Sequence, residues 1–438
     1  MLPADFEVDI DFQFHKLPVV ARLLPYCAPR LAIAFVLSSG CGSSPTTSST
    51  PPDGSGATSV FGANDPFDIA VAGLTADQRD TFVNGDSLFD LALREYDGLG
   101  PLYTRSSCGS CHAEGVRGPG LVQKMVVVDA DGLTPAVDQS KLPFGHTVHP
   151  LLTAGATTPV VPPAGDPTIK VSIRLGPPIL GRGYLEAVAD SEMERVAAEQ
   201  AQRTDGIHGR VNHVVYSAQP NPDTSFHGHQ PGDPVIGRFG LKARIFSVDE
   251  FTADALQGDM GITSPLRPTE IPNPNGLTDD RKPGVDVGID SVNQRSLYVR
   301  MTAIPRRAAG DPRGPQLFEQ ALCSACHAPT MKTRADYPIA PLAGIDAPIY
   351  TDLLLHDLGD LRADGIVEGE AGGRDWRTAP LIGLRFNKVF MHDGSAATIE
   401  EAVHEHAGPG SEASGSVSAF DALPPADQAL LLQFVSTL

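Results

Sequence analysis

Two short segments of the sequence combine cysteine and histidine at a spacing that suits covalent binding of a cofactor. Residues 108–112 read CGSCH and residues 323–327 read CSACH. Two thiols at this spacing reach both vinyl groups of one porphyrin and form thioethers, and the adjoining imidazole then binds the iron. The sequence therefore predicts two covalently bound haem c groups. The attachment residues are Cys108, Cys111, Cys323 and Cys326, and the proximal iron ligands are His112 and His327.

Three other uses of these cysteines fit the sequence less well. A structural zinc site would need the four thiolates at one centre, but the two pairs lie far apart in the chain and each has its own histidine. A thioredoxin-like redox pair would lie in a βαβ context, which neither segment shows. A disulfide across two intervening residues is strained and rare.

The N-terminal region is typical of an exported protein. The apolar run 31–37 (LAIAFVL) follows Arg30 and is followed by small residues up to Cys41, as in a lipoprotein signal peptide. Leu37 lies four residues before the cysteine rather than the usual three, and the acidic residues within 1–15 suggest that the true start is later. A buried strand with a core cysteine is the alternative. We predict a signal peptide over 1–40, lipid on Cys41 and a flexible tether over 41–60.

Composition limits the partners. The chain has 438 residues, with 33 Lys and Arg against 53 Asp and Glu, which gives a net charge of −20. Such a protein is repelled by nucleic acid and by anionic bilayers, and a basic protein partner fits better. No apolar run is long enough for a transmembrane helix, so membrane contact is expected only through the lipid. Because Gly42 rather than Asp follows the lipidated cysteine, we predict a periplasmic location at the outer membrane.

Helices are predicted around both motifs. The pattern G-x-x-L-F-acid occurs at 85–90 and 314–319 and predicts helices whose Leu-Phe pair packs on a haem. Thr75 and Gln78 form a possible capping box for the first of them. An apolar stripe near the C-terminus predicts a last helix after two prolines. We predict a mainly α fold with two cytochrome-c-like haem domains, 61–300 and 301–438, and a loop-rich, mixed insertion at about 120–300.

A further helix is predicted just after residue 398. Thr398 and Glu401 again suit a capping box. Ile399, Ala402, Val403 and His406 then occupy one apolar face at helical spacing, whereas His404 lies off that face and should be solvated.

Several segments resemble the bacterial di-haem oxidoreductase family, which is often labelled thiol oxidoreductase-like and is considered to include peroxidases. They are 237–243 (GRFGLKA), 259–264 (DMGITS), 352–359 (DLLLHDLG), 376–381 (WRTAPL) and 392–394 (HDG). The resemblance covers about residues 61–438, and the C-terminal part is also similar to di-haem cytochrome c peroxidases and to the maturase of methylamine dehydrogenase. It implies two cytochrome-c-like domains. The thiol label fits poorly, because haem and lipid leave no free cysteine.

The resemblance also implies roles for individual residues. His406 aligns with the second ligand of the electron-transfer haem in the related peroxidases, where it is usually Met. His356 and His392 are expected to border a haem, or else to orient turns through Asp357 and Asp393. Other candidates with an ordinary structural alternative are Arg306 and Arg307 as propionate partners and Trp376 between the haems. The first haem is expected to be open, with His146, His149, His208, His213, His227 and His229 as alternative ligands.

Three functions follow from these expectations. In a peroxidase-like oxidoreductase, a small basic cytochrome c or a cupredoxin reduces the second haem, and the first haem reacts with an oxidant such as peroxide. In a di-haem electron carrier, both irons have two protein ligands and no catalysis occurs. A maturase-like protein would take electrons from a large protein substrate. The sequence assigns no catalytic acid or base, and it assigns no ligands to a calcium ion, which remains compatible with the resemblance.

Overall fold

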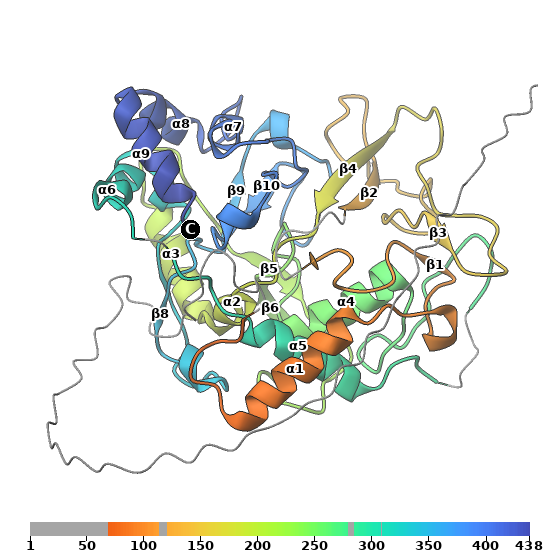
Figure 1. The fold of residues 1–438 in the computed structure, drawn as a ribbon. Coiled ribbons are helices and arrows are strands. Elements are labelled where there is room, and N and C mark those ends of the chain that lie inside the picture. The colour runs from red at the N-terminus through yellow and green to blue at the C-terminus, as the bar shows by residue number, and fades with distance from the viewer. Residues whose placement is uncertain (1–68, 114–120, 279–283, 308) are drawn as a thin grey trace, which may run out of the picture. The chain divides into compact units, whose positions relative to one another are not determined.

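The computed structural model describes residues 69–113, 121–278, 284–307 and 309–438 (Figure 1). The predicted signal peptide, the predicted lipid attachment at Cys41 and the predicted tether over 41–60 lie outside the described residues. In the described ranges, no helix combines the length and the apolar character needed to cross a membrane.

The described part of the chain mixes helices with small sheets. The helices are α1 (Ala76–Asp90), α2 (Arg182–Ala187), α3 (Asp190–Gln200), α4 (Val248–Met260), α5 (Ile289–Met301), α6 (Arg313–Gln320), α7 (Ile399–Glu405), α8 (Ser414–Asp421) and α9 (Pro425–Val435). The strands are β1 (Leu102–Tyr103), β2 (Leu121–Val127), β3 (Leu151–Leu152), β4 (Ile169–Leu175), β5 (Asn212–Val215), β6 (Pro234–Gly237), β7 (Met331–Lys332), β8 (Asp346–Ala347), β9 (Leu355–Asp357) and β10 (Asp375–Arg377).

These strands form antiparallel pairs: β1 with β3, β2 with β4, β5 with β6, β7 with β8, and β9 with β10. The prediction of a mainly α chain is therefore only partly right, because the fold is mixed α/β. Strands of two or three residues, such as β1, β7 and β9, are too short to leave a period-two pattern in the sequence. The seven-residue strands β2 and β4 lie within residues 120–300, which the sequence indicated only as a mixed insertion. The longest pair, β2 with β4, leads directly into the segment that contacts both cysteine motifs.

The predicted helix starts are confirmed. Thr75 caps α1 and Thr398 caps α7, and in each case the side chain of the third helical residue closes a capping box. The C-terminal helix α9 begins at Pro425, and it buries Leu431 and Val435.

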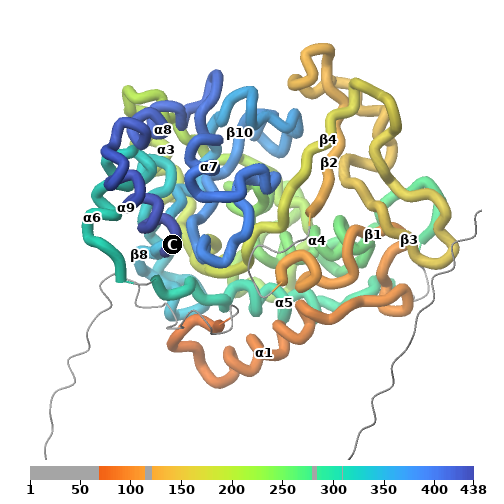
Figure 2. The backbone as a smooth tube through the Cα atoms, turned by 45° about the horizontal axis from the view of Figure 1, so that its top comes forward, coloured from red at the N-terminus to blue at the C-terminus, as the bar shows by residue number. Residues whose placement is uncertain are grey.

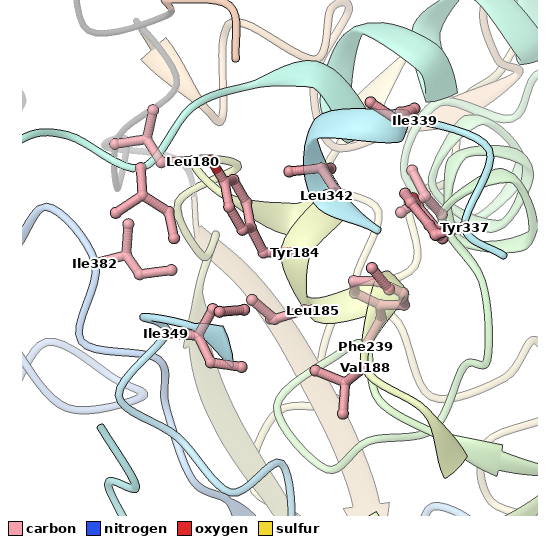
Figure 3. Packing of buried hydrophobic residues seen from close by; sticks show 14 of the residues in the cluster. Leu180, Tyr184, Leu185, Val188, Phe239, Tyr337, Ile339, Leu342, Ile349 and Ile382 are labelled. Carbon is pink, nitrogen blue, oxygen red and sulfur yellow. The ribbon is translucent and has the colours of Figure 1, made fainter. Parts of the chain in front are cut away.

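The largest apolar core surrounds the short helix α2. Tyr184 and Leu185 are fully buried there and pack with Leu342, Ile349 and Ile382 (Figure 3). The same cluster includes residues of α1 and α5, which lie side by side in Figures 1 and 2. Residues from both sides of position 300 therefore share one core, and the predicted division of the chain at this position stays a prediction.

A second core lies beside the second cysteine motif. Helices α6 and α9 pack against each other, as Figures 1 and 2 show, and bury Leu317, Phe318 and Leu431 together with Phe420 of α8. Cys323 packs at the margin of this cluster. This core therefore fixes the start of the motif.

A buried charge network connects α2, α4 and α5. Arg300 of α5 pairs with Glu186 of α2 at 2.6 Å and with Asp249 of α4 at 2.7 Å. The hydroxyl of Tyr337 donates to Glu186 at 2.7 Å, and the His227 ring contacts Asp249 at 3.1 Å. Since each charge is buried and paired, this network fixes how α2 is oriented, and Arg182 at the start of α2 lines the site described next.

Candidate haem sites

The second cysteine motif opens onto an apolar cavity of about 270 Å³. The motif follows α6 and forms a short 3-10 helix, Cys323–Ala325, after a left-handed residue at Leu322. The cavity is lined by both thiols and His327, by Phe318 of α6, and by one face of α7. The predicted apolar face of that helix is confirmed, since its residues Ile399, Ala402, Val403 and His406 all line the cavity.

The rings of His327 and His406 face each other across this cavity. Their centroids are 6.4 Å apart and their planes differ by 67°. Two imidazoles bound to one metal ion at about 2 Å each would have ring centres separated by roughly 6 Å. The observed separation therefore leaves space for one iron between the two rings.

Both rings present the same nitrogen to the cavity. Nδ1 of His327 donates to the carbonyl oxygen of Tyr350 at 3.2 Å, and Nδ1 of His406 donates to that of Ala402 at 2.6 Å. A carbonyl only accepts, so the proton lies on Nδ1 and the lone pair lies on Nε2. Burial lowers the pKa of His327 to about 4 and also lowers the pKa of His406. Both are neutral imidazoles, as metal ligation requires.

The first cysteine motif also fixes its histidine. Nδ1 of His112 donates to the carbonyl oxygen of Pro177 at 2.7 Å, and the ring lies 6.1 Å from that of Phe89. Phe89 therefore lies beside this motif, and its packing on a haem stays a prediction. Burial lowers the pKa of His112 to about 4, so its Nε2 is a free ligand atom.

The two sites differ in their second histidine. Among the described residues, the only ring contact of His112 is with Phe89. None of the six histidines considered as alternative partners has a ring contact with His112 among the described residues. Their side-chain contacts are His146 with Met125 O, His149 with Gly258 O, His208 with Gln200 O, His213 with Glu370, His227 with Asp249 and His229 with Asp233. In the described chain, facing imidazoles are therefore found at the second motif and not at the first.

None of the four motif cysteines forms a disulfide in the described residues. Burial raises the pKa of Cys108 to about 11 and that of Cys323 to about 12. A redox-active Cys-x-x-Cys pair has a thiol of lowered pKa. These sites therefore do not have the character of a thiol-disulfide centre, whereas two thiols beside one histidine at an apolar cavity fit haem c.

A carboxyl group that the sequence did not single out lies near the first motif. Asp259 is in the last turn of α4, and its carbonyl oxygen accepts from the backbone NH of Thr104 at 2.7 Å, just before the motif. Burial raises the pKa of Asp259 to about 6, although the nearby Lys124 counteracts this effect. The charge of Asp259 also acts on Cys108 and Cys111. This carboxyl can exchange a proton near neutral pH.

His356 lies between two carboxylates beside the second motif. Its Nε2 donates to Asp352 at 3.0 Å and its Nδ1 donates to Glu412 at 2.8 Å, so the ring carries both protons. Burial alone would lower the pKa of His356, but the charge of Asp352 outweighs it and the pKa is raised well above its usual value. The sulfur of Cys326 is 3.7 Å from the ring. His356 therefore borders the cavity, and its partners are not the adjacent Asp357.

Trp376 and His392 form a stacked pair in the cavity wall. Their ring centroids are 3.9 Å apart, and Trp376 donates through Nε1 to the carbonyl oxygen of Arg362 at 3.0 Å. The ammonium of the buried Lys242 lies 4.3 Å from the Trp376 ring. The carbonyl oxygen of His392 accepts from the NH of Leu175, at the end of β4. The pair thus lies between the second site and the strand that leads to Pro177.

The arginines at the cavity are not the ones the sequence suggested. Arg306 is exposed, and Arg307 donates to the Tyr350 hydroxyl at 2.7 Å. Neither lines the cavity, whereas Arg182 and Arg377 do. Arg182 directly follows the apolar run 177–181 (PPILG), and this position within an apolar segment was the available signal in the sequence.

Comparisons with known proteins give one clear result. Residues 165–438 match the family model described as "Di-haem oxidoreductase, putative peroxidase", and the chain belongs to this family. The resemblance inferred from the motifs is confirmed. The family implies two haems; the second motif lies within the matched residues and the first precedes them. A comparison with curated proteins gives no match.

Similarity to solved structures is weak. Hydrazine synthase of Kuenenia stuttgartiensis is 12% identical with a TM-score of 0.34, over 94% of this chain and 100% of that chain. The diheme peroxidase BthA from Burkholderia thailandensis is 14% identical with a TM-score of 0.35, over 81% of this chain and 86% of that chain. TM-scores this low do not establish a common fold.

Replacing His406 tests the facing pair. In the haem-loaded protein, we expect His406→Ala to convert the second iron from low spin to high spin, because a strong-field ligand is lost. Electron paramagnetic resonance of the oxidised protein measures this change. His404→Ala is the matched control, since His404 is on the same helix but contacts Asp421 at the surface. An unchanged low-spin signal in His406→Ala would contradict the assignment.

Replacing His356 tests the buried imidazolium. His356→Gln leaves Asp352 and Glu412 without their cation, and we expect the free energy of unfolding to fall by about 3–5 kcal/mol. Because the pKa of His356 is raised in the folded protein, its protonated ring stabilises the fold fully below pH 6.5, the pKa in the unfolded chain. This stabilisation is lost as the pH rises through the pKa in the folded protein. The loss should therefore be larger at about pH 6 than at about pH 9.

Denaturant unfolding at both pH values measures the effect of this substitution. His213→Gln, which removes an exposed His–Glu pair, is the control and should change stability little. An equal loss at both pH values would show that the imidazolium charge is not involved.

Proposed function

We propose that this protein is a di-haem c-type oxidoreductase that reduces peroxide. His327 and His406 would hold the haem that accepts electrons, and His112 would hold the haem at which peroxide is reduced. The observation that carries this proposal is the difference between the two sites, because two facing imidazoles occur at the second motif and one fixed imidazole at the first. An iron with two protein ligands transfers electrons, whereas an iron with one can bind a substrate. The family match supports the same activity.

The residues of the chain have separate tasks in this proposal. His112 and His327 hold the irons through Nε2, and their Nδ1–H groups are held by backbone carbonyls, which fixes the ring orientation. Bound haem supplies the redox chemistry. Asp259 holds or releases a proton at its carboxyl beside the first motif, as cleavage of a peroxide bond requires. Trp376 and His392 provide two stacked rings in the wall of the second site. These rings lie on the side of β4, the strand that leads toward the first site.

The setting of the reaction is also proposed from the sequence. Haem attachment to this motif and the features around Cys41 favour a periplasmic lipoprotein at the outer membrane. A net charge of −20 favours a basic electron donor, such as a small cytochrome c or a cupredoxin, whose association would weaken with added salt. The alternative is a di-haem electron carrier, which would need a second protein ligand at the first iron as well.

Spectroscopy and peroxide turnover separate the two functions. Protein made with haem-maturation machinery should carry two covalent haems by intact mass. Its oxidised form should give one high-spin and one low-spin signal, and it should consume peroxide when a reduced donor is present. Two low-spin irons that do not react with peroxide would support the carrier. A mass without haem would refute both functions.

Replacing Asp259 tests its acid–base role. Because positioned proton transfer contributes about 10²–10⁴-fold, we expect Asp259→Asn to lower the rate of reaction with peroxide by about 100-fold or more. In the unmodified protein, the rate should rise as the pH rises through about 6, where Asp259 ionises, and the variant should lose this dependence. Stopped-flow absorbance at several pH values measures both effects. The exposed Asp290→Asn is the control, and an unchanged pH profile in Asp259→Asn would exclude the role.

A further inference from the structure

Two buried arginines line the apolar cavity without an ion-pair partner among the described residues. Arg182 and Arg377 are both 7% exposed. The Nη1 atom of Arg182 is buried and has no hydrogen-bond partner. The groups that do bind these side chains are neutral carbonyls: Nε of Arg182 donates to Pro178 at 2.7 Å, and Arg377 donates to Gly240 and Thr378 at 3.0 and 2.8 Å.

This arrangement is unfavourable unless an anion binds there. Burial, and then the neighbouring Arg377, lower the pKa of Arg182 to about 9, and burial lowers that of Arg377 to about 10. Two other buried arginines have carboxylate partners, since Arg174 pairs with Asp364 and Arg300 pairs with Glu186. Removing a guanidinium from water without a counter-charge is costly, so two such groups facing one cavity define an anion site.

The ligand is indicated by what else lines the cavity. Cys323, Cys326 and His327 line it together with the two arginines. A haem attached to these thiols carries two carboxylates on one edge of an otherwise apolar ring. Apolar walls with a pair of guanidinium groups match that distribution of charge, since arginine is well suited to carboxylates.

The arginine pair also lies next to the first site. Pro177 accepts from Nδ1 of His112 at 2.7 Å, and the following residue, Pro178, accepts from Nε of Arg182. The charge of Arg182 acts on His112 directly. Two consecutive carbonyls therefore connect the proximal histidine of one motif to an arginine in the cavity of the other.

We propose that Arg182 and Arg377 bind the propionates of the haem attached at Cys323 and Cys326, and that Arg182 holds this haem edge beside His112 of the first site. This inference rests on the proposed di-haem function and adds an anion subsite and an inter-site contact to it.

Potentiometry of single variants tests the subsite. In Arg182→Gln and Arg377→Gln, the propionates lose a cation, which favours the oxidised haem. We expect the ratio of reduced to oxidised second haem, at a fixed ambient potential, to fall about tenfold or more. The potential should also become dependent on pH near neutrality, because the freed propionate then titrates. Arg182→Lys should restore most of the loss, and Arg195→Gln, at an exposed pair on α3, should change nothing.

The first haem provides a second measurement. Arg182→Gln should also shift the high-spin signal of the first haem, whereas Arg377→Gln should not, since only Arg182 is coupled to His112. Intact mass must show two haems in each variant before potentials are compared. If haem is attached and neither variant alters the second haem, the subsite is refuted and the di-haem function stands. If the unmodified protein carries no haem, the di-haem function itself fails.

Discussion

The apolar cavity beside Cys323 is the feature on which the rest of the structure depends. It lies between the core of α6, α8 and α9 and the segment that leads into α2, and it draws its walls from parts of the chain that are far apart in sequence. Apolar side chains around a cavity of about 270 Å³ gain contact energy only when a group of matching shape fills it. A flat, largely apolar ring, as the proposed haem would provide, fits this requirement.

Most of the buried charged side chains discussed above are paired with a side chain of opposite charge. Arg300, Glu186 and Asp249 form a paired network between helices, and Lys242 pairs with Asp364 while lying over the Trp376 ring. Such pairs are weak evidence for stability but strong constraints on geometry, because breaking one leaves an isolated charge. Groups that depart from this pattern are therefore informative. The Nη1 atom of the buried Arg182, beside the second motif, has no hydrogen-bond partner. Near the first motif, burial raises the pKa of Asp259, although the charges of Lys124 and Arg244 oppose this shift.

The two motifs share the pattern Cys-x-x-Cys-His, but the residues that surround them differ. At the second motif, α7 supplies a histidine that faces the proximal one. At the first motif, the neighbouring groups are a backbone carbonyl, an aromatic ring and a titratable carboxyl. The segment from Leu175 to Arg182 lies between them, because it contacts His392 at one end, His112 in the middle and the cavity at the other end. In the proposed function, this short stretch of chain would connect the electron-accepting site with the reactive site.

The sequence alone determined the features that depend on local spacing. The Cys-x-x-Cys-His segments fix two thiols and an imidazole within five residues, capping boxes fix the first turns of α1 and α7, and helical periodicity places His406 on an apolar face. Each of these follows from the geometry of adjacent residues, which one sequence contains in full.

Only the tertiary structure decided which distant residues meet. Arg182 and Arg377 line the cavity, whereas Arg306 and Arg307 do not. The ring of His356 contacts Glu412 rather than Asp357. The tertiary structure also showed strands of two or three residues that turn a mainly α prediction into a mixed fold. The physical reason is common to all three. A long-range ion pair, a short strand and a cavity wall are made by residues whose separation in sequence bears no relation to their distance in space, so no local pattern records them.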